Sequence, residues 1–117
     1  MPPTDDIPRL TAQARSVLRE KFLAAGMGVT GANFAVAETG SIVVVENEGN
    51  IRFCTSVPRI HVAVVGIEKV IPRQADLAVF LRLIARSATG QKMGAYMSVV
   101  TGARRAGEPD GPEEFHL

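Results

Sequence analysis

The segment TGANFAVAETGSIVVVENEGNIRFCTSVPRIHVAVVG, residues 30–66, decides the fold of this chain. Three short runs in it are rich in β-branched and apolar residues, which is typical of strands: Phe34–Ala37, Ile42–Val45 and His61–Val65. The first two runs flank the compact turn Glu38–Ser41, so they predict an antiparallel hairpin. Ile42–Val45 is apolar throughout, as expected for a strand covered on both faces. Polar residues occupy the connections, and we expect this segment to form much of any binding site.

Helical patterns lie on both sides of this segment. From Pro8 to Ala25 the apolar residues recur at helical spacing and share one face, which consists of Leu10, Ala14, Val17, Leu18 and Phe22. Thr4, Asp5 or Asp6 is expected to cap that helix, with Pro8 in its first turn. A second helix is predicted over Arg73–Ser87, with Leu77, Phe80, Leu81 and Ile84 on its buried side.

The remaining segments complete a one-domain α/β plan. Met93–Val100 reads as a strand, residues 103–112 as a loop, and Glu113–Leu117 as the start of another element. The link from the His61 strand through the second helix to the Met93 strand predicts a right-handed, parallel βαβ unit. We therefore expect a mixed sheet covered by helices, in a single domain over residues 1–117 with a flexible lead at residues 1–7.

Composition excludes several functional classes. The chain is 46% hydrophobic and 21% charged, which argues against disorder. The formal net charge is only +1 and tryptophan is absent, so we expect no nucleic-acid partner. No apolar run approaches the ~20 residues that span a bilayer, and the N-terminal residues do not form a signal peptide. Cys54 is the only cysteine, which fits a cytoplasmic protein and excludes a self-contained cysteine-ligated zinc or iron–sulfur site.

Three glycines match a dinucleotide-binding pattern in residue type and spacing, but not in their position relative to strand and helix. Gly26, Gly28 and Gly31 have Gly-x-Gly-x-x-Gly spacing. A dinucleotide fingerprint must follow a strand and open a helix, so that the pyrophosphate meets the helix N-terminus. Here the glycines follow a helix and lead into strands. We interpret them as a helix stop and a tight turn.

Glu38 is the most informative single residue. A carboxylate between two apolar strands is solvated, hydrogen-bonded or functional. One hypothesis makes it a nucleophile or a general acid/base. The other, which we favour, makes it an acceptor of backbone N–H groups that fixes the turn.

Other polar residues are candidates for ligand binding. Asn33, beside Thr30 and Gly31, is a better candidate than Asn47, which we assign to a turn. Arg104 and Arg105 follow the predicted carboxyl end of a strand, where open α/β sheets bind ligands. They form either an anion site for a carboxylate or phosphate, or a solvated basic loop. A lone histidine such as His61 is more often hydrogen-bonded structure than a metal ligand, and no metal site is expected.

A long ordered series of segments carries a resemblance to a known family. The segments are Thr30–Val43, Asn47–Asn50, Pro58, His61, Gly66–Pro72, Ser87–Gln91, Thr101–Gly102 and Asp110–His116. Together they resemble the LUD domain, the lactate-utilisation domain, and more closely its iron–sulfur branch, lactate utilisation protein B. The resemblance covers nearly the whole chain after Pro8.

The resemblance implies a fold like that of the NagB/RpiA/CoA-transferase group. It also implies a part in oxidising L-lactate to pyruvate in the cytoplasm, together with companion lactate-utilisation proteins. Family members of this branch hold [4Fe–4S] clusters on cysteine motifs downstream of the domain. Because this chain has only Cys54, clusters are expected only in a full-length member. The chain resembles a truncated domain, so we expect uncovered apolar sheet surface and a homo-oligomer.

The family motif also implies a site region. Its matching residues are Thr30, Gly31, Asn33, Glu38, Thr39, Gly40, Asn50 and Glu68. The leading interpretation is a domain that binds a small organic acid or a partner subunit while the redox centres lie elsewhere. One alternative is a stand-alone CoA-transferase or isomerase that uses Glu38, with an anion site at Arg104 and Arg105. The other is a non-catalytic assembly module.

Overall fold

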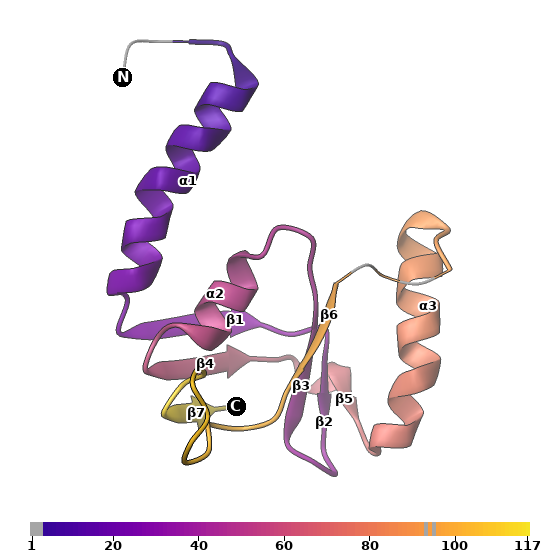
Figure 1. Cartoon of the computed structure of the whole chain (residues 1–117). Helices are drawn as coiled ribbons and strands as arrows, with labels where there is room; N and C mark the ends of the chain where they lie inside the picture. The colour runs from indigo at the N-terminus through magenta and orange to yellow at the C-terminus, as the bar shows by residue number, and fades with distance from the viewer. Residues whose placement is uncertain (1–3, 93, 95) are drawn as a thin grey trace.

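The described part of the chain forms two β-sheets and three α-helices (Figure 1). The computed structural model describes residues 4–92, 94 and 96–117. The elements are α1 (Ile7–Ala24), β1 (Met27–Gly31), β2 (Phe34–Val36), β3 (Ser41–Val45), α2 (Asn50–Ser56), β4 (Ile60–Val64), β5 (Val70–Ile71), α3 (Leu77–Thr89), β6 (Met97–Val100) and β7 (Glu114–His116). Short 3₁₀ turns lie at Ile67–Lys69 and Gln74–Asp76.

The two sheets differ in direction. The parallel sheet has the order β1-β4-β7, and His61 of β4 pairs with Gly28 on one side and Phe115 on the other. The mixed sheet has the order β5-β2-β3-β6. Within it β2 and β3 form the predicted antiparallel hairpin, with Phe34 opposite Val43. The expected mixed α/β architecture, with helices on the sheets, is confirmed.

The core lies on both faces of β3. On one face Val43 joins a cluster with Val36, Ile71 and Leu77, which packs α3 against the mixed sheet. On the other face Ile42 and Val44 join Ala63 of β4, which packs the two sheets together. Ile42 and Val43 are 0% exposed, so the fully apolar run behaves as a strand that is covered on both faces.

The predicted βαβ unit is wrong. β4 lies in the parallel sheet, whereas β6 lies in the mixed sheet and runs antiparallel to β3. Between them the chain adds the two-residue strand β5, which pairs parallel to β2 and moves the chain from one sheet to the other. Local apolar patterns identify strands but do not specify which sheet a strand joins.

The interpretation of the Gly26–Gly31 segment as a tight turn is also wrong. Gly28 and Gly31 lie within β1, and only Gly26 lies in the bend after α1. A side chain on Gly28 would collide with the backbone carbonyl of Cys54 in α2. Gly28 therefore lets α2 pack closely against the parallel sheet.

Helix boundaries follow the sequence with two differences. Asp6 caps α1 by accepting a hydrogen bond from the Arg9 N–H, and a proline stands in its first turn, as predicted. The second predicted helix begins later, at Leu77, after a 3₁₀ turn. The sequence did not predict α2. Part of the predicted Met93–Val100 strand falls on residues 93 and 95, which lie outside the described residues.

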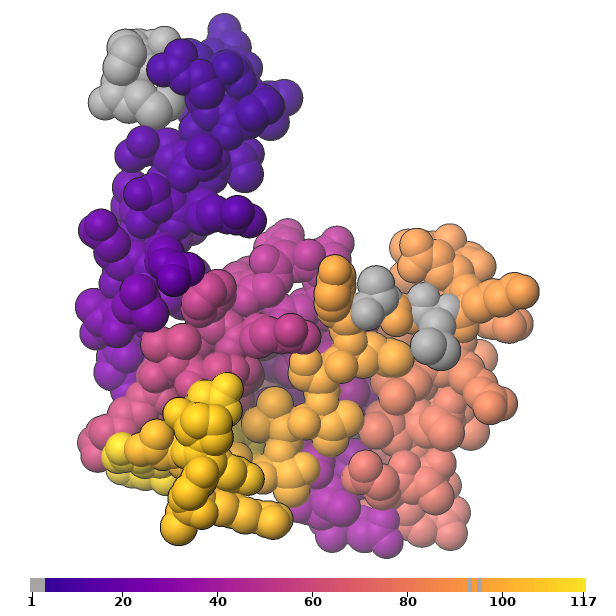
Figure 2. Space-filling view, in the orientation of Figure 1, coloured from indigo at the N-terminus to yellow at the C-terminus, as the bar shows by residue number. Residues whose placement is uncertain are grey.

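The apolar face of α1 is not buried within the chain. Not one of its 18 residues is buried. The helix projects from the body of the molecule, as the cartoon and the space-filling view both show (Figures 1 and 2).

Candidate functional site

Asn33 is fixed at one end of the mixed sheet. It lies between β1 and β2, two residues after the carboxyl end of β1. Its Oδ1 accepts a hydrogen bond from the backbone N–H of Val45 at 2.8 Å, and its own N–H donates to the Val43 carbonyl at 2.8 Å. The carboxamide is thereby held against the end of β3, and its Nδ2 group remains the donor that it can offer to a ligand.

A cavity of about 490 Å³ opens beside Asn33, between the end of β3 and the last turns of α3. Its volume is within the range that small-molecule sites usually have. One part of the wall is apolar and another carries amide, hydroxyl and carboxylate groups. The lining residues are Asn33, Val45, Glu46, Asn47, Ile84, Ala85, Ala88, Thr89, Gln91 and Gly94.

Glu46 connects this cavity to α2. Its two carboxylate oxygens accept the backbone N–H groups of Ile51 at 3.0 Å and Arg52 at 3.1 Å. These are unpaired donors of the first turn of α2, so a carboxylate is well placed there. Glu46 and Asn47 also line a neighbouring hollow of about 230 Å³, together with Arg52 and Tyr96. Because they share Glu46 and Asn47, the two hollows adjoin each other at one end of the mixed sheet.

Glu38 lies at the opposite end of β2 from Asn33. Its Oε2 accepts the backbone N–H of Gln74 at 2.8 Å, and its own N–H donates to the Pro72 carbonyl at 3.1 Å. The carboxylate thus caps the 3₁₀ turn that leads into α3, which is the backbone-bonding role favoured from the sequence. The side chain of Glu38 is exposed. Its hydrogen bond to Gln74 does not test a catalytic role, so the catalytic hypothesis stays a prediction. Gly40 in the same turn has φ +68°, a conformation that favours glycine.

A chain of hydroxyl groups continues from this turn. Thr39 Oγ1 lies 2.7 Å from Ser41 Oγ, which lies 2.7 Å from Thr101 Oγ1 at the end of β6. Ser41 is only 1% exposed. The hydroxyl chain joins the β2–β3 turn to the edge strand, and sequence spacing gave no sign of it.

Thr30 belongs to the core of the parallel sheet. Its Oγ1 lies 2.8 Å from His61 Nε2, and His61 is 0% exposed. Burial lowers the pKa of His61 below its ordinary value of 6.5. Within the described part of the chain, Nδ1 of this ring has no hydrogen-bond partner. This pair matches the structural role expected for a lone histidine.

The other predicted site residues are dispersed. Gly31 ends β1 and pairs with Val64. Asn50, the first residue of α2, donates to Glu48 at 3.3 Å. Glu68 is exposed on the first 3₁₀ turn. None of these three lines the cavity beside Asn33.

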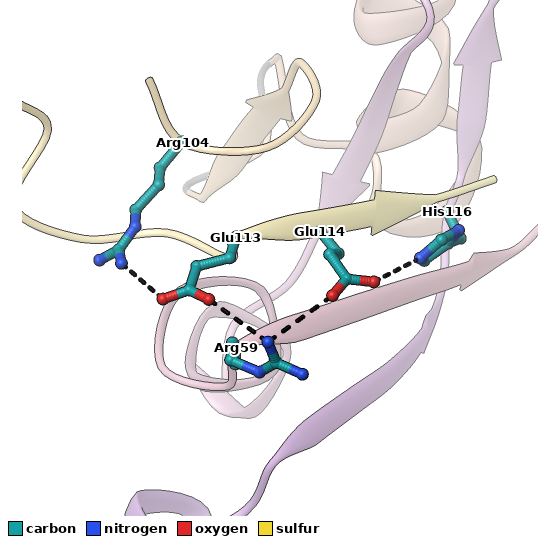
Figure 3. A network of polar contacts seen from close by, with 5 residues as sticks. All are labelled: Arg59, Arg104, Glu113, Glu114 and His116. Atoms are coloured by element: carbon teal, nitrogen blue, oxygen red, sulfur yellow. Dashed lines mark hydrogen bonds and ion pairs between the residues drawn. The ribbon is translucent and has the colours of Figure 1, made fainter. Parts of the chain in front are cut away.

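The two arginines lie on the loop between β6 and β7. Arg104 donates to Glu113 at 2.8 Å, and Glu113 also faces Arg59 at 3.6 Å (Figure 3). The backbone N–H of Arg105 donates to Glu108 at 2.6 Å. A hollow of about 440 Å³ lies among these groups, with charges of both signs on its wall. The carboxylates offset much of the positive potential that an anion site needs.

Two further chemical possibilities bear on the site. Burial, with a smaller contribution from Glu46, raises the pKa of the Cys54 thiol, so it is not an activated nucleophile. Over residues 4–92, 94 and 96–117, no three side chains of the metal-ligating types lie together.

In the same part of the chain no helix is long and apolar enough to cross a bilayer.

Sequence reasoning identified Asn33 but missed the residues that complete its cavity. Thr89 and Gln91 come from the end of α3, and Glu46 follows β3. The available signal was the resemblance itself, because Ser87–Gln91 is one of its matching segments. The fold and this cavity define a two-sheet α/β domain with a largely apolar pocket, carrying a few polar groups, at the end of its hairpin.

The chain belongs to the LUD domain family. The family model, described as LUD domain, matches residues 4–117. The chain is 55% identical over 108 residues to lactate utilization protein B of Bacillus pumilus, and 51% identical to the protein of that name in Shouchella clausii. It is also 51% identical to an uncharacterized electron transport protein, YkgF, of Escherichia coli.

The chain spans only about a quarter of the length of these relatives. Each match covers 92% of this chain but only 23% of the relative. The crystal structure of a DUF162 family protein from Deinococcus radiodurans has a similar fold, with a TM-score of 0.58 and 19% identity. That match covers 83% of this chain and 54% of the other.

Proposed function

We propose that this chain is the LUD-domain part of a protein of L-lactate oxidation to pyruvate, and that it binds a small organic acid beside Asn33. The observation that carries the proposal is the similarity, at 51–55% identity over 92% of the chain, to proteins named lactate utilization protein B. The cavity beside Asn33, whose wall is largely apolar with a few polar groups, supplies the place for the ligand. The proposal adds no redox step to this chain.

The cavity offers groups that suit a hydroxy or keto acid. A carboxylate accepts hydrogen bonds from amide N–H groups, and three residues with carboxamide side chains, Asn33, Asn47 and Gln91, line the cavity. A ligand hydroxyl both donates and accepts, so Thr89 and Glu46 are suitable partners for it. Ala85 and Ala88 give an apolar wall for a methyl group. We therefore assign the ligand to the class of short acids with one carboxylate and one adjacent oxygen.

The residues of this chain do not fit an iron–sulfur cluster. A [4Fe–4S] cluster is held by four cysteine thiolates, and this chain has Cys54 alone. We propose that the clusters belong to other parts of a full-length family member. Companion lactate-utilisation proteins, a cytoplasmic location and self-association are further parts of the same proposal. The names of the relatives support its lactate-utilisation part.

The test is an NMR titration of the 117-residue chain with L-lactate and, separately, with pyruvate. The side-chain amide signals of Asn33, Asn47 and Gln91 should shift in a saturable manner. The Asn33→Asp variant should bind at least about tenfold more weakly, because a lost donor and a repulsive charge together exceed 1.4 kcal/mol. The variant keeps an oxygen for the Val45 N–H, so its fold is preserved.

The matched control is Asn50→Asp, which makes the same chemical change outside the cavity. It should bind both acids like the unmodified chain. Equal binding by Asn33→Asp, or signals that move only around Glu38, would contradict the assignment of the site.

A further inference from the structure

The cavity beside Asn33 is larger than L-lactate needs. Its volume of about 490 Å³ lies in the range of sites that hold drug-sized ligands, roughly 300–1,000 Å³. Its wall is largely apolar, and α3 contributes Ile84, Ala85 and Ala88 to that wall. L-Lactate has a single methyl group to place against these side chains. The volume and the apolar wall together indicate a ligand with more apolar surface than L-lactate.

A second hollow continues from this cavity along α3. We call it the α3 hollow; it has a volume of about 300 Å³ and is lined by Phe34, Phe80, Leu83, Ile84, Ser87 and Ala88. Ile84 and Ala88 also line the cavity beside Asn33, so the two hollows share part of their wall. They also meet at β2, because Asn33 lines the cavity and the next residue, Phe34, lines the α3 hollow.

The α3 hollow follows a line of apolar side chains on its helix. Phe80, Ile84 and Ala88 are spaced four residues apart, so they lie above one another along a stripe about 12 Å long. At the far end of the stripe the ring of Phe80 lies 5.3 Å from the ring of Phe34, centroid to centroid. Ser87 supplies the one polar side chain among the lining residues. An aliphatic chain in this hollow would therefore leave few polar groups without a partner.

We propose that the ligand of this site is a 2-hydroxy or 2-keto acid with an extended aliphatic chain, which runs from the cavity beside Asn33 past Ala88 into the α3 hollow. This inference rests on the proposed function. It keeps the carboxylate and the adjacent oxygen at the groups around Asn33, and it replaces the methyl group of lactate by a longer chain. Ala88 keeps the passage open, because only a methyl group stands at the wall that both hollows share.

Affinity should rise with chain length as methylene groups enter the α3 hollow. Each fully buried methylene group strengthens binding by about fourfold. Phe80 is 40% exposed and Leu83 is 56% exposed, so the chain keeps part of its surface in water and the gain per methylene group is smaller. We expect L-2-hydroxyoctanoate to bind at least about tenfold more tightly than L-lactate, because about two fully buried methylene groups already account for that factor.

NMR titrations of the 117-residue chain with L-lactate, L-2-hydroxyoctanoate and 1-octanol test the proposal. Both acids should shift the side-chain amide signal of Asn33. The longer acid should also shift the methyl signals of Leu83, whereas L-lactate should leave them in place. 1-Octanol carries the same chain length without the acid. It should bind at least about tenfold more weakly than L-2-hydroxyoctanoate, since it lacks the groups that bind around Asn33.

Variants on α3 locate the aliphatic chain. Leu83→Gln places a polar group on the wall of the α3 hollow, so the advantage of L-2-hydroxyoctanoate over L-lactate should fall by at least about threefold. Val79→Gln is the matched control: the residue is 59% exposed, lies on the same helix and lines neither hollow, so the advantage should remain. Ala88→Phe should abolish the advantage, because the larger side chain fills the passage. Circular dichroism checks that each variant keeps its helices.

The outcomes separate this inference from the proposed function. If L-lactate shifts the Asn33 signal but L-2-hydroxyoctanoate binds no more tightly, the inference is wrong and the proposed function stands. If neither acid shifts the Asn33 signal, both are wrong. Equal binding of 1-octanol and the longer acid would indicate an apolar surface without an acid site, and would overturn the inference. An advantage that survives both Leu83→Gln and Ala88→Phe would do the same.

Discussion

The side-chain oxygen of Asn33 accepts the backbone N–H of Val45 at 2.8 Å, so one residue both closes the strand hairpin and faces the cavity. The side-chain oxygen is occupied by this structural hydrogen bond, so the NH₂ group is the part of the side chain that the proposed ligand would contact. Structure and binding can therefore be separated by replacing one end of the same side chain.

Asn33→Ala should destabilise the chain by about 1–3 kcal/mol, because the half-buried Val45 N–H loses its acceptor. Asn33→Asp, which keeps an oxygen at that place, should lose much less. Urea denaturation of the two variants beside the unmodified chain checks this difference. Equal losses for alanine and aspartate would show that the hydrogen bond contributes little.

Gly28→Ala should destabilise the chain by about 1–3 kcal/mol, since the added carbon meets the Cys54 carbonyl and pushes α2 from the sheet. Gly26→Ala is the control, because no atom lies within 4 Å of its added carbon. It should be neutral or slightly stabilising. Thermal unfolding of both variants gives the comparison, and a harmless Gly28→Ala would rule out the close packing of α2 on β1.

Stability should fall in mild acid because of His61. Burial lowers its pKa in the folded chain, so the unfolded chain binds the proton first. The free energy of unfolding should be insensitive to this group above pH 7. It should decrease as the pH falls below about 6.5, by up to about 1.4 kcal/mol per pH unit, until the folded-state pKa is reached.

His61→Gln should flatten the stability profile between pH 7 and pH 5, while the exposed control His116→Gln should keep the slope. Urea midpoints at several pH values provide the measurement. An unchanged slope in His61→Gln would assign the acid sensitivity to other groups.

Glu38→Gln tests the role of the turn carboxylate. The amide oxygen can still accept the Gln74 N–H, so stability should change by less than about 0.5 kcal/mol, whereas Glu38→Ala should cost about 1 kcal/mol. If Glu38 only caps the turn, any turnover by the intact protein should be unchanged by Glu38→Gln. Loss of most turnover in a stable Glu38→Gln protein would support the CoA-transferase-like alternative.

Local patterns predicted the elements that are defined locally. The Phe34–Val45 hairpin could be predicted because two apolar runs flank a short turn. β5 could not, because its two residues are a strand only through pairing with β2. The assignment of β4 and β6 to different sheets likewise depends on contacts far apart in the sequence.

The residues around the candidate site could be predicted in part for the same reason, and their binding role stays a prediction. Asn33 is recognisable from its neighbours and from the family motif. Its anchor on Val45 depends on the register of the hairpin, and the contribution of Gln91 depends on how α3 packs. Glu38, Arg104 and Arg105 were predicted as site residues together with Asn33. The fold places all three outside the cavity beside Asn33.

The most direct test of the central claim is a crystal structure of this chain grown with L-lactate or pyruvate. We predict that the acid lies in the cavity beside Asn33, with its carboxylate about 3 Å from the Asn33 Nδ2 atom. An acid bound only at Glu38 or at the Arg104–Arg105 loop would contradict the assignment, as would an empty cavity at concentrations that saturate the chain in solution.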